Sequence, residues 1–307
     1  IKSSYDTVFG TSGTVFSALA AYLISNVYKT QFIVEYRDIT ALQIVATSGK
    51  KSIYYYIIKY IELFLARRAQ MVITVTEGYQ EWLVQNSINR SKIRTIPNGF
   101  DFNKLPNTVN TKYNTLPSNS LPRVIAYFGT LGISQDLEFW EHILQEIENI
   151  GVKFLFIGDG ARKEYIKKLE KRFESLEYLS SMDELELERY YELADFNIVS
   201  IKLSEEFKHT VPSKIVDIME DANPVVVHGQ ENGEAARILR ESKGGFVLRE
   251  DPKKAAEQIS EIIQLTRDEI QSMGKNGYKY VRDKYNRTVL AKKLHSYIRE
   301  IIIKEAV

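Results

Sequence analysis

The chain has 307 residues, of which 44% are hydrophobic and 26% charged, and this length predicts two domains rather than one. Its 41 basic and 40 acidic residues leave a net charge of +1, which excludes the strong positive field of a sequence-independent nucleic-acid binder. The absence of cysteine excludes disulfides, thiolate zinc sites and a cysteine nucleophile, and it agrees with the reducing cytoplasm. No apolar run has the roughly 18 residues of a membrane-spanning helix, and we expect no signal sequence at the amino end.

The first third of the chain alternates segments rich in β-branched and aromatic residues with helical patterns, which is typical of parallel α/β layers. We expect strands at residues 7–9, 31–36, 71–75 and 93–97, and helices at residues 15–26, 51–66 and 79–85. Residues 1–104 are therefore interpreted as a first α/β domain. Residues 105–121 are rich in Asn, Thr, Pro and Ser, and this composition indicates a linker.

The remainder repeats the same alternation, and its first two strands end at glycine. We expect strands at residues 123–128, 153–157, 196–200, 224–228 and 246–248, and helices at residues 137–148, 163–174, 185–193, 213–221, 233–241, 252–277 and 286–304. Residues 122–285 are interpreted as a second α/β domain. The helix within residues 286–307 is expected to pack back on the first domain.

Two glycine-containing loops follow strands of the second domain, at residues 129–132 and 158–160. Ligands of open parallel sheets bind beyond the carboxyl ends of the strands, where glycines let backbone amides approach a phosphate. Neither loop is the dinucleotide fingerprint G-x-G-x-x-G, because Ala161-Arg162-Lys163 follows Gly160. The alternative is that these glycines only form strand-to-helix turns.

The helix that begins after Pro212 is a candidate phosphate site. A proline at a helix start leaves the amides of Ser213 and Lys214 free at the positive end of the helix dipole, and Lys214 adds a full charge. Asp217, one turn later, could accept hydrogen bonds from ribose hydroxyls. The alternative is a surface helix with a solvated lysine.

Several short motifs follow one another along the chain. They are residues 66–77 (ARRAQMVITVTE), 96–101 (IPNGFD), 128–132 (FGTLG), 156–160 (FIGDG), 193–195 (LAD) and 212–214 (PSK), the last ahead of 223–226 (NPVV). In this order and spacing, from about Tyr5 to the end, the chain resembles the retaining glycosyltransferases of the GT-B fold, group 1 or family 4-like. The Pro212-Ser213-Lys214 motif resembles the branch that builds bacterial capsule, lipopolysaccharide O-antigen and related surface polysaccharides on lipid carriers.

The resemblance implies two Rossmann-like, doubly wound parallel-sheet domains facing a cleft, with the first, acceptor-side domain incomplete at its amino end. It implies that a nucleotide-sugar donor, such as a UDP- or GDP-sugar, binds the second domain without a cofactor or metal. The residues implied for the donor site are Gly129 and Thr130 at the phosphates, Gly158, Asp159 and Gly160 near the nucleotide, Met182 at the base, and Pro212, Ser213, Lys214 and Asp217 around the diphosphate and ribose.

The chain departs from the family pattern in two places. The family's pair of glutamates, eight residues apart, falls on His209 and Asp217, so only a shortened second acid is present. Many relatives have an arginine after the first glycine of the 129–132 loop and a lysine a few residues later, whereas this chain has Thr130 and no lysine before Lys153. Neutralisation of the phosphates is therefore expected to depend on Lys214 and helix dipoles.

Arg37, Asp38 and His209 are the candidate catalytic residues. Glu35, Arg37 and Asp38 lie at or just after the carboxyl end of a predicted strand, where an acceptor hydroxyl could be bound or deprotonated. The alternative is that these are solvated loop residues. The resemblance implies that retention needs no enzyme nucleophile, because the leaving diphosphate itself can assist the acceptor hydroxyl, so stabilisation of the leaving group is the main expected contribution.

Residues 50–68 combine lysines and arginines with an unusual density of tyrosine. Such a helix suits a bilayer interface, where a lipid-linked acceptor would be presented, but it could equally be a core helix. We therefore predict a cytoplasmic enzyme that transfers a hexosyl or aminosugar group to a hydroxyl of a glycan or lipid-linked saccharide, with peripheral membrane contact through residues 50–68. The alternatives are a non-catalytic partner protein with this fold and a nucleotide-sugar epimerase.

Overall fold

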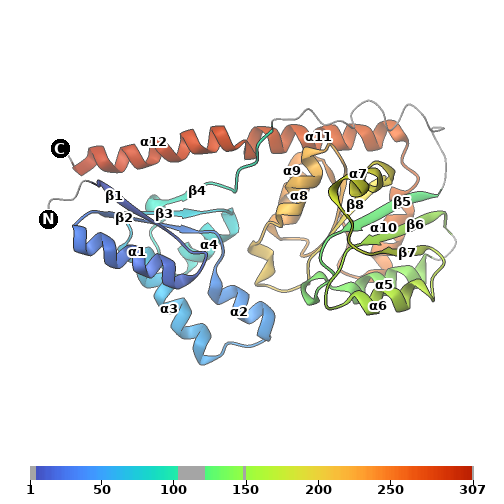
Figure 1. Ribbon diagram of the computed structural model, residues 1–307, viewed down its shortest axis with the longest axis horizontal. Helices are drawn as coiled ribbons and strands as arrows, with labels where there is room; N and C mark the ends of the chain where they lie inside the picture. Colours follow the sequence, from blue (N-terminus) through green and yellow to red (C-terminus); the bar gives the residue numbers. More distant parts are fainter. Residues whose placement is uncertain (1–4, 103–121, 148–149, 306–307) are drawn as a thin grey trace. The chain divides into compact units, whose positions relative to one another are not determined.

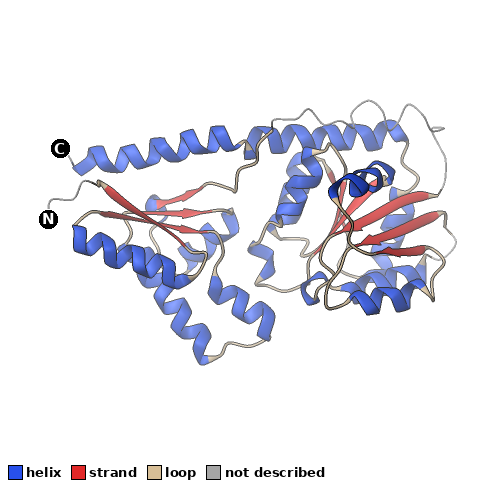
Figure 2. Ribbon diagram, viewed as in Figure 1, coloured by secondary structure: helices blue, strands red, loops and turns tan. Residues whose placement is uncertain are grey.

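The structure is a computed structural model that describes residues 5–102, 122–147 and 150–305. The chain divides into two compact α/β units (Figures 1 and 2). The first comprises Ile1–Asp101, Ser204–Val211 and Tyr285–Val307, and the second comprises Phe102–Leu203 and Pro212–Lys284. The predicted linker, residues 105–121, lies outside the described residues.

The first unit contains a sheet of four parallel strands in the order β1-β2-β3-β4. The strands are β1 (Thr7–Thr11), β2 (Gln31–Tyr36), β3 (Met71–Thr74) and β4 (Ile93–Thr95). The helices are α1 (Val15–Tyr28), α2 (Thr40–Ser48), α3 (Ile53–Arg68), α4 (Glu77–Gln85) and α12 (Arg287–Glu305), with short 3₁₀ turns η1 (Arg90–Lys92) and η4 (Phe207–His209).

Alternation along β2 builds two cores on opposite faces of this sheet. Phe32, Val34 and Tyr36 belong to the core that α1 and α3 cover. Ile33 faces the other way and belongs to a smaller core that includes Leu290 of α12. Figure 1 shows α1 and α3 on one side of the sheet and α12 on the other. The last helix of the chain thus completes the first unit.

The second unit contains six parallel strands in the order β10-β9-β8-β5-β6-β7. The strands are β5 (Arg123–Phe128), β6 (Val152–Ile157), β7 (Leu176–Leu179), β8 (Phe196–Ser200), β9 (Val225–His228) and β10 (Gly245–Val247). The helices are α5 (Leu137–Glu146), α6 (Lys163–Glu170), α7 (Glu184–Leu193), α8 (Ser213–Glu220), α9 (Glu234–Ser242), α10 (Pro252–Ile262) and α11 (Arg267–Tyr285), with a 3₁₀ turn η3 (Ile133–Gln135).

The strand order of the second unit reverses at β5. The chain proceeds from β5 to β6 and β7 on one side, and then returns to place β8, β9 and β10 on the other. Ile125 and Tyr127 of β5 pack into the core with α5, α6 and α10, whereas Ala126 and Phe128 pack with α7. Such a reversal opens a crevice at the carboxyl ends of the strands, where parallel sheets bind ligands.

The single helix predicted at residues 252–277 is wrong, because the chain breaks between α10 and α11. The buried guanidinium of Arg123 donates to the carbonyl oxygens of Ile263 and Leu265, at 3.2 and 2.5 Å. The side chain of Glu269 then accepts from the Thr266 amide at 2.8 Å, and the Glu269 amide donates to the Thr266 hydroxyl, which starts the new helix. The break thus falls where a buried side chain 140 residues away in sequence binds the carbonyl groups that follow α10.

Two further elements have no counterpart in the sequence prediction. β7 lies at the edge of its sheet and has only four residues, so its sequence is too short to give a clear strand pattern. α2 begins after Ile39, which offers no side-chain cap. Its first amides, those of Thr40 and Ala41, donate instead to the carboxylate of Glu62 at 2.7 and 3.3 Å. The capping group comes from α3 and cannot be found by local pattern.

We predict that Glu62 makes the stability of the first unit depend on pH. Burial raises the pKa of its carboxyl from 4.5 to about 7, although the amides of Thr40 and Ala41 oppose this. The folded protein then binds more protons than the unfolded chain between pH 4.5 and 7, so stability falls as pH rises through this range, by at most about 3 kcal/mol. Denaturant unfolding at several pH values measures this slope.

Glu62→Gln retains one acceptor oxygen and should flatten the pH dependence relative to the unsubstituted protein. Glu62→Ala removes both acceptors and should lower stability at every pH. A slope unchanged in Glu62→Gln would show that another group is responsible.

Candidate functional site

A pocket of about 330 Å³ opens in the second unit at the carboxyl ends of β5, β6 and β7. Its walls come from four segments of the chain. The lining residues are Phe128, Gly129, Thr130, Ile157, Gly158, Asp159, Ser181, Met182, Leu187 and Lys214. Six predicted donor residues therefore meet here: Gly129, Thr130, Gly158, Asp159, Met182 and Lys214. Gly160, Pro212, Ser213 and Asp217 are adjacent along the chain but are not lining residues.

The floor of the pocket is made by two loops in close backbone contact. The Gly129 amide donates to the Ile157 carbonyl at 3.0 Å, and the Leu131 amide donates to the Asp159 carbonyl at 2.8 Å. Gly158 has φ +158°, and a Cβ there would lie 1.8 Å from the Gly129 carbonyl oxygen. Only glycine fits this position. These glycines bring the loops together, and the amides of Gly129 and Leu131 are used within the protein.

Free amide donors lie elsewhere. No described residue accepts a hydrogen bond from the amide of Thr130, on the rim of the floor, or from those of Ser213 and Lys214 in the first turn of α8. The Ile215 amide already donates to the Pro212 carbonyl, at 3.1 Å. α8 thus presents two unused amides and the positive end of its dipole beside the Lys214 that lines the pocket.

Aromatic side chains support Lys214. Its Nζ lies 5.4 Å from the centre of the Tyr191 ring, and that ring stacks on Phe128 at 4.0 Å. Among the described residues, no carboxylate forms an ion pair with Lys214. Its charge is therefore held at the pocket wall and is not neutralised by an ion pair.

Two carboxylates lie in or next to the pocket, in different environments. Asp217 is half-buried, and burial raises its pKa although Lys214 lowers it. No hydrogen bond to Asp217 occurs within the described ranges, so its oxygens can accept from hydroxyl groups. Asp159 is exposed, and its pKa is lowered by the hydrogen bond from Lys163, 3.0 Å away, and by the Gly160 amide. As a fixed anion it disfavours phosphate on its own side of the pocket.

A polar cluster at the far end of the β5–α5 loop was not predicted from the sequence. His228, fully buried and stacked on Phe139, places its Nε2 3.0 Å from Asp136 Oδ2. This hydrogen bond lowers the pKa of Asp136, and the charge of Lys202 lowers it further. The Lys202 amide also donates to the Ser134 carbonyl at 2.8 Å. The only sequence signal was that Lys202 follows β8 and that His228 ends β9. The strand order then places β8 directly beside β5 and β9 beside β8, which the sequence does not reveal.

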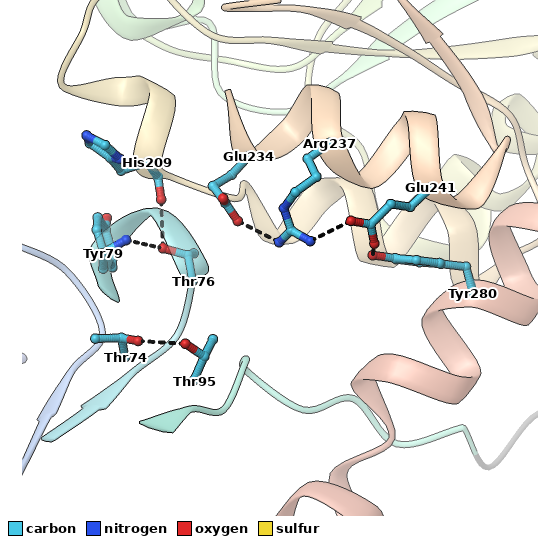
Figure 3. A network of polar contacts seen from close by, with 9 residues as sticks. All are labelled: Thr74, Thr76, Tyr79, Thr95, His209, Glu234, Arg237, Glu241 and Tyr280. Atoms are coloured by element: carbon cyan, nitrogen blue, oxygen red, sulfur yellow. Dashed lines mark hydrogen bonds and ion pairs between the residues drawn. The ribbon is translucent and has the colours of Figure 1, made fainter. Parts of the chain in front are cut away.

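The candidate catalytic residues belong to the first unit. The Tyr79 hydroxyl lies 3.5 Å from Asp38 Oδ1 and 3.2 Å from Thr210 Oγ1. Thr76 donates from its hydroxyl to the His209 carbonyl at 2.8 Å and accepts from the Tyr79 amide (Figure 3). Asp38 is therefore brought near the 209–210 segment through Tyr79, which sequence reasoning did not select.

The three predicted catalytic residues differ in environment. Arg37 is exposed, whereas Asp38 is half-buried and burial raises its pKa. Burial and Lys208 lower the pKa of His209, which therefore favours the neutral imidazole near pH 7. A Cβ on Gly78 would lie 2.8 Å from His209 Nδ1, so this ring packs tightly against α4. His209 and Asp217, matched above to one glutamate pair, fall in different compact units.

Residues 5–102, 122–147 and 150–305 contain no group of three or more histidine or carboxylate side chains that could hold a metal ion. Within the same ranges, no helix has the length and apolar character needed to cross a membrane.

Comparison with known proteins supports the sequence resemblance. Residues 4–104 match the model of Glycosyltransferase Family 4. A curated relative, the probable glycosyltransferase WbjE of Pseudomonas aeruginosa, is 28% identical over 184 residues. That match covers 59% of this chain but only 45% of WbjE, so the chain spans less than half of that relative.

Solved structures share the architecture. HepE of Anabaena, crystallised with UDP, is 16% identical with a TM-score of 0.74, and the match covers 97% of this chain and 79% of HepE. Sucrose-phosphate synthase of Thermosynechococcus elongatus is 17% identical with a TM-score of 0.73, covering 98% of this chain and 74% of that protein. The predicted GT-B fold, with two parallel-sheet α/β domains, is confirmed.

We predict that Gly158→Ala disrupts the pocket floor. The added methyl would overlap the Gly129 carbonyl oxygen and occupy an unfavourable φ, so we expect the free energy of unfolding to fall by about 3 kcal/mol. Gly129→Ala is the matched control, because its φ of +149° is also unfavourable but its Cβ would meet nothing closer than 3.6 Å. We expect it to cost about 1 kcal/mol. Equal losses in chemical denaturation would argue against close loop contact.

Proposed function

We propose that this protein is a glycosyltransferase that moves a sugar from a nucleotide diphosphate sugar to a hydroxyl of a glycan or lipid-linked saccharide, with retention at the anomeric carbon. The observation that carries the proposal is the pocket at the strand-order reversal, where Lys214 and the unused amides of α8 converge. The same fold in HepE was solved with UDP, which supports a nucleotide diphosphate as ligand.

The chain's own residues suggest how a donor would be held. We assign the diphosphate to the first turn of α8, where the amides of Ser213 and Lys214 and the Lys214 ammonium offer three donors. The leaving diphosphate gains charge as the glycosidic bond breaks, so these fixed donors would stabilise the transition state more than the ground state. We assign ribose hydroxyls to Asp217, and the base to the side of the pocket that contains Met182.

We assign the acceptor to the first unit, where Asp38 would orient or deprotonate its hydroxyl. The raised pKa of this half-buried carboxyl favours proton acceptance compared with an exposed aspartate. Arg37 and His209 would bind neighbouring oxygens of the acceptor or of the transferred sugar. No metal or cofactor is assigned a role.

The class of product and the location are part of the same proposal. The name of WbjE, a probable glycosyltransferase, supports glycosyl transfer, and that of the lipopolysaccharide outer core galactosyltransferase WaaB supports transfer of a hexosyl group during synthesis of a bacterial surface polysaccharide. Transfer of an aminosugar group is the alternative within the same proposal. Synthesis of such a polysaccharide would place the enzyme in the cytoplasm at the inner face of the membrane. A non-catalytic partner protein is the second candidate, favoured by Thr130 and His209 at positions where the family has charged residues.

Calorimetric titration with UDP, GDP, ADP and CMP tests the donor site. Lys214→Met should weaken binding of the preferred nucleoside diphosphate by about 10- to 100-fold while leaving the free nucleoside almost unaffected, because we assign the lysine to the phosphates alone. Asp217→Asn should weaken both ligands by about tenfold, because the carboxylate contacts ribose. Loss of diphosphate binding alone would indicate a phosphate role, and loss of both ligands would indicate a ribose role.

Lys153→Met is the control for charge, because Lys153 lies at the start of β6 and pairs with Glu177 outside the pocket. We expect it to leave nucleotide binding unchanged. Failure of all four nucleotides to bind the folded protein would favour the non-catalytic partner.

Measurement of kcat tests the role proposed for Asp38 at the acceptor hydroxyl. Asp38→Asn should lower kcat by about 10²- to 10⁴-fold, a range typical of general acid–base catalysis, with little change in donor affinity. Asp6→Asn, a substitution of an exposed aspartate in the same unit, should leave kcat unchanged. Full activity of Asp38→Asn would rule out the role proposed for Asp38 at the acceptor hydroxyl, but it would not affect the proposal for the donor site.

A further inference from the structure

One side of α3 exposes large hydrophobic side chains to solvent. Ile53, Tyr54, Tyr56, Ile57 and Tyr60 are between 50% and 77% exposed, and we call this set the α3 aromatic face. The opposite side of the same helix packs into the core of the first unit through residues that include Tyr55 and Ile58. The core-helix alternative therefore accounts for one side of α3 only.

α3 and the residues beside it in sequence expose only basic charges. Lys50 and Lys51 precede α3, Lys59 lies within it, and Arg67 and Arg68 end it. The one acidic residue among residues 39–76 is Glu62, whose carboxylate is fully buried against α2. Acidic charge lies nearby in space, because burial and the charges of neighbouring groups, Glu206 among them, raise the pKa of Tyr55 on the buried side of α3. The chain as a whole has almost equal numbers of acids and bases, whereas the charges that α3 and its flanking residues expose are all basic.

The neighbouring helix extends the apolar surface without adding charge. α1 contains no charged residue, and it exposes Phe16, Leu23 and Val27, each more than 55% accessible. The two helices contact each other through Tyr22 and Phe64, whose ring centres are 5.4 Å apart. Figure 1 places both helices on the same side of the sheet. Single exposed apolar residues are common, but a set as large as the α3 aromatic face marks an interaction surface.

We propose that the α3 aromatic face docks on a bilayer surface that contains anionic lipids. Tyrosine rings have an apolar body and a polar hydroxyl and are enriched at the level of lipid headgroups, while flanking lysines and arginines are attracted to anionic headgroups. α3 would lie in the plane of the interface with its far side still packed on the sheet. Because the far side of α3 packs into the core of the first unit, the proposed contact is peripheral.

A second copy of this chain suits the surface less well. In a twofold dimer the same patch would meet itself, and the lysines of one α3 would face those of the other. Protein interfaces are depleted in lysine at their centres, and like charges brought together there cost several kcal/mol. Anionic lipid neutralises these charges instead. The inference deepens the proposed function, since a membrane surface would present a lipid-linked acceptor, but its test does not depend on transferase activity.

Vesicle flotation tests the proposal with the full chain. We expect binding to vesicles of phosphatidylcholine and phosphatidylglycerol, and much weaker binding to phosphatidylcholine alone. The double substitution Ile57→Glu and Tyr60→Glu should reduce binding to the mixed vesicles at least tenfold. Replacing Lys50, Lys51 and Lys59 by Gln should reduce it about a hundredfold and remove the preference for anionic lipid.

Val289→Glu is the matched control, because Val289 is 56% exposed on α12 and lies outside the α3 aromatic face. We expect it to bind vesicles normally. Thermal unfolding of each variant shows whether it is folded, and titration with UDP shows whether its donor site is intact. A variant that passes both tests but fails to bind vesicles has lost membrane docking alone. Absence of vesicle binding by the unsubstituted protein overturns the proposal, as does unchanged binding in both α3 variants. Self-association that is abolished by Ile57→Glu and Tyr60→Glu, without any vesicle binding, would assign the face to a second copy instead.

Discussion

The close backbone contact between the loops after β5 and β6 is the constraint from which the candidate donor site follows. With no room for a Cβ at Gly158, two strand ends approach to within hydrogen-bonding distance and form a continuous floor. The rest of the pocket is arranged around that floor: Phe128 stacks on Tyr191, and Tyr191 lies beneath the ammonium of Lys214. The positive charge at the site is therefore positioned by sterically required glycines and by aromatic packing.

Much of this architecture could be predicted from the sequence. Buried parallel strands have near-continuous apolar runs, so β2, β5 and β8 were predicted with their observed bounds. The glycine loops and the Pro212 helix start are local signals and were likewise recognisable. Their meeting in one pocket depended on the rule that parallel strands present their carboxyl ends at one edge.

The features that were not predicted depend on contacts between distant residues. The carboxylate that caps α2 comes from Glu62, and the carbonyls that end α10 are bound by Arg123. The Asp136–His228 pair joins residues 92 positions apart in the sequence. In each case a polar group buried by tertiary packing finds its partner on another element, since an unpaired buried polar group is costly. Local periodicity contains no information on such pairs.

The first unit is assembled from both ends of the chain, and this affects the order in which the protein can fold during synthesis. Ile33, Met71 and Ile73 have their core completed by Leu290 and its neighbours on α12, and residues 204–211 join the same unit from the middle of the chain. The ribosome has therefore translated past Leu290 before the first unit can close this core. The second unit lies within residues 102–284, and its last strand, β10, ends at Val247. All of its strands are therefore synthesised before Leu290. Although amino-terminal domains generally fold first, here the later domain is the one that can finish first.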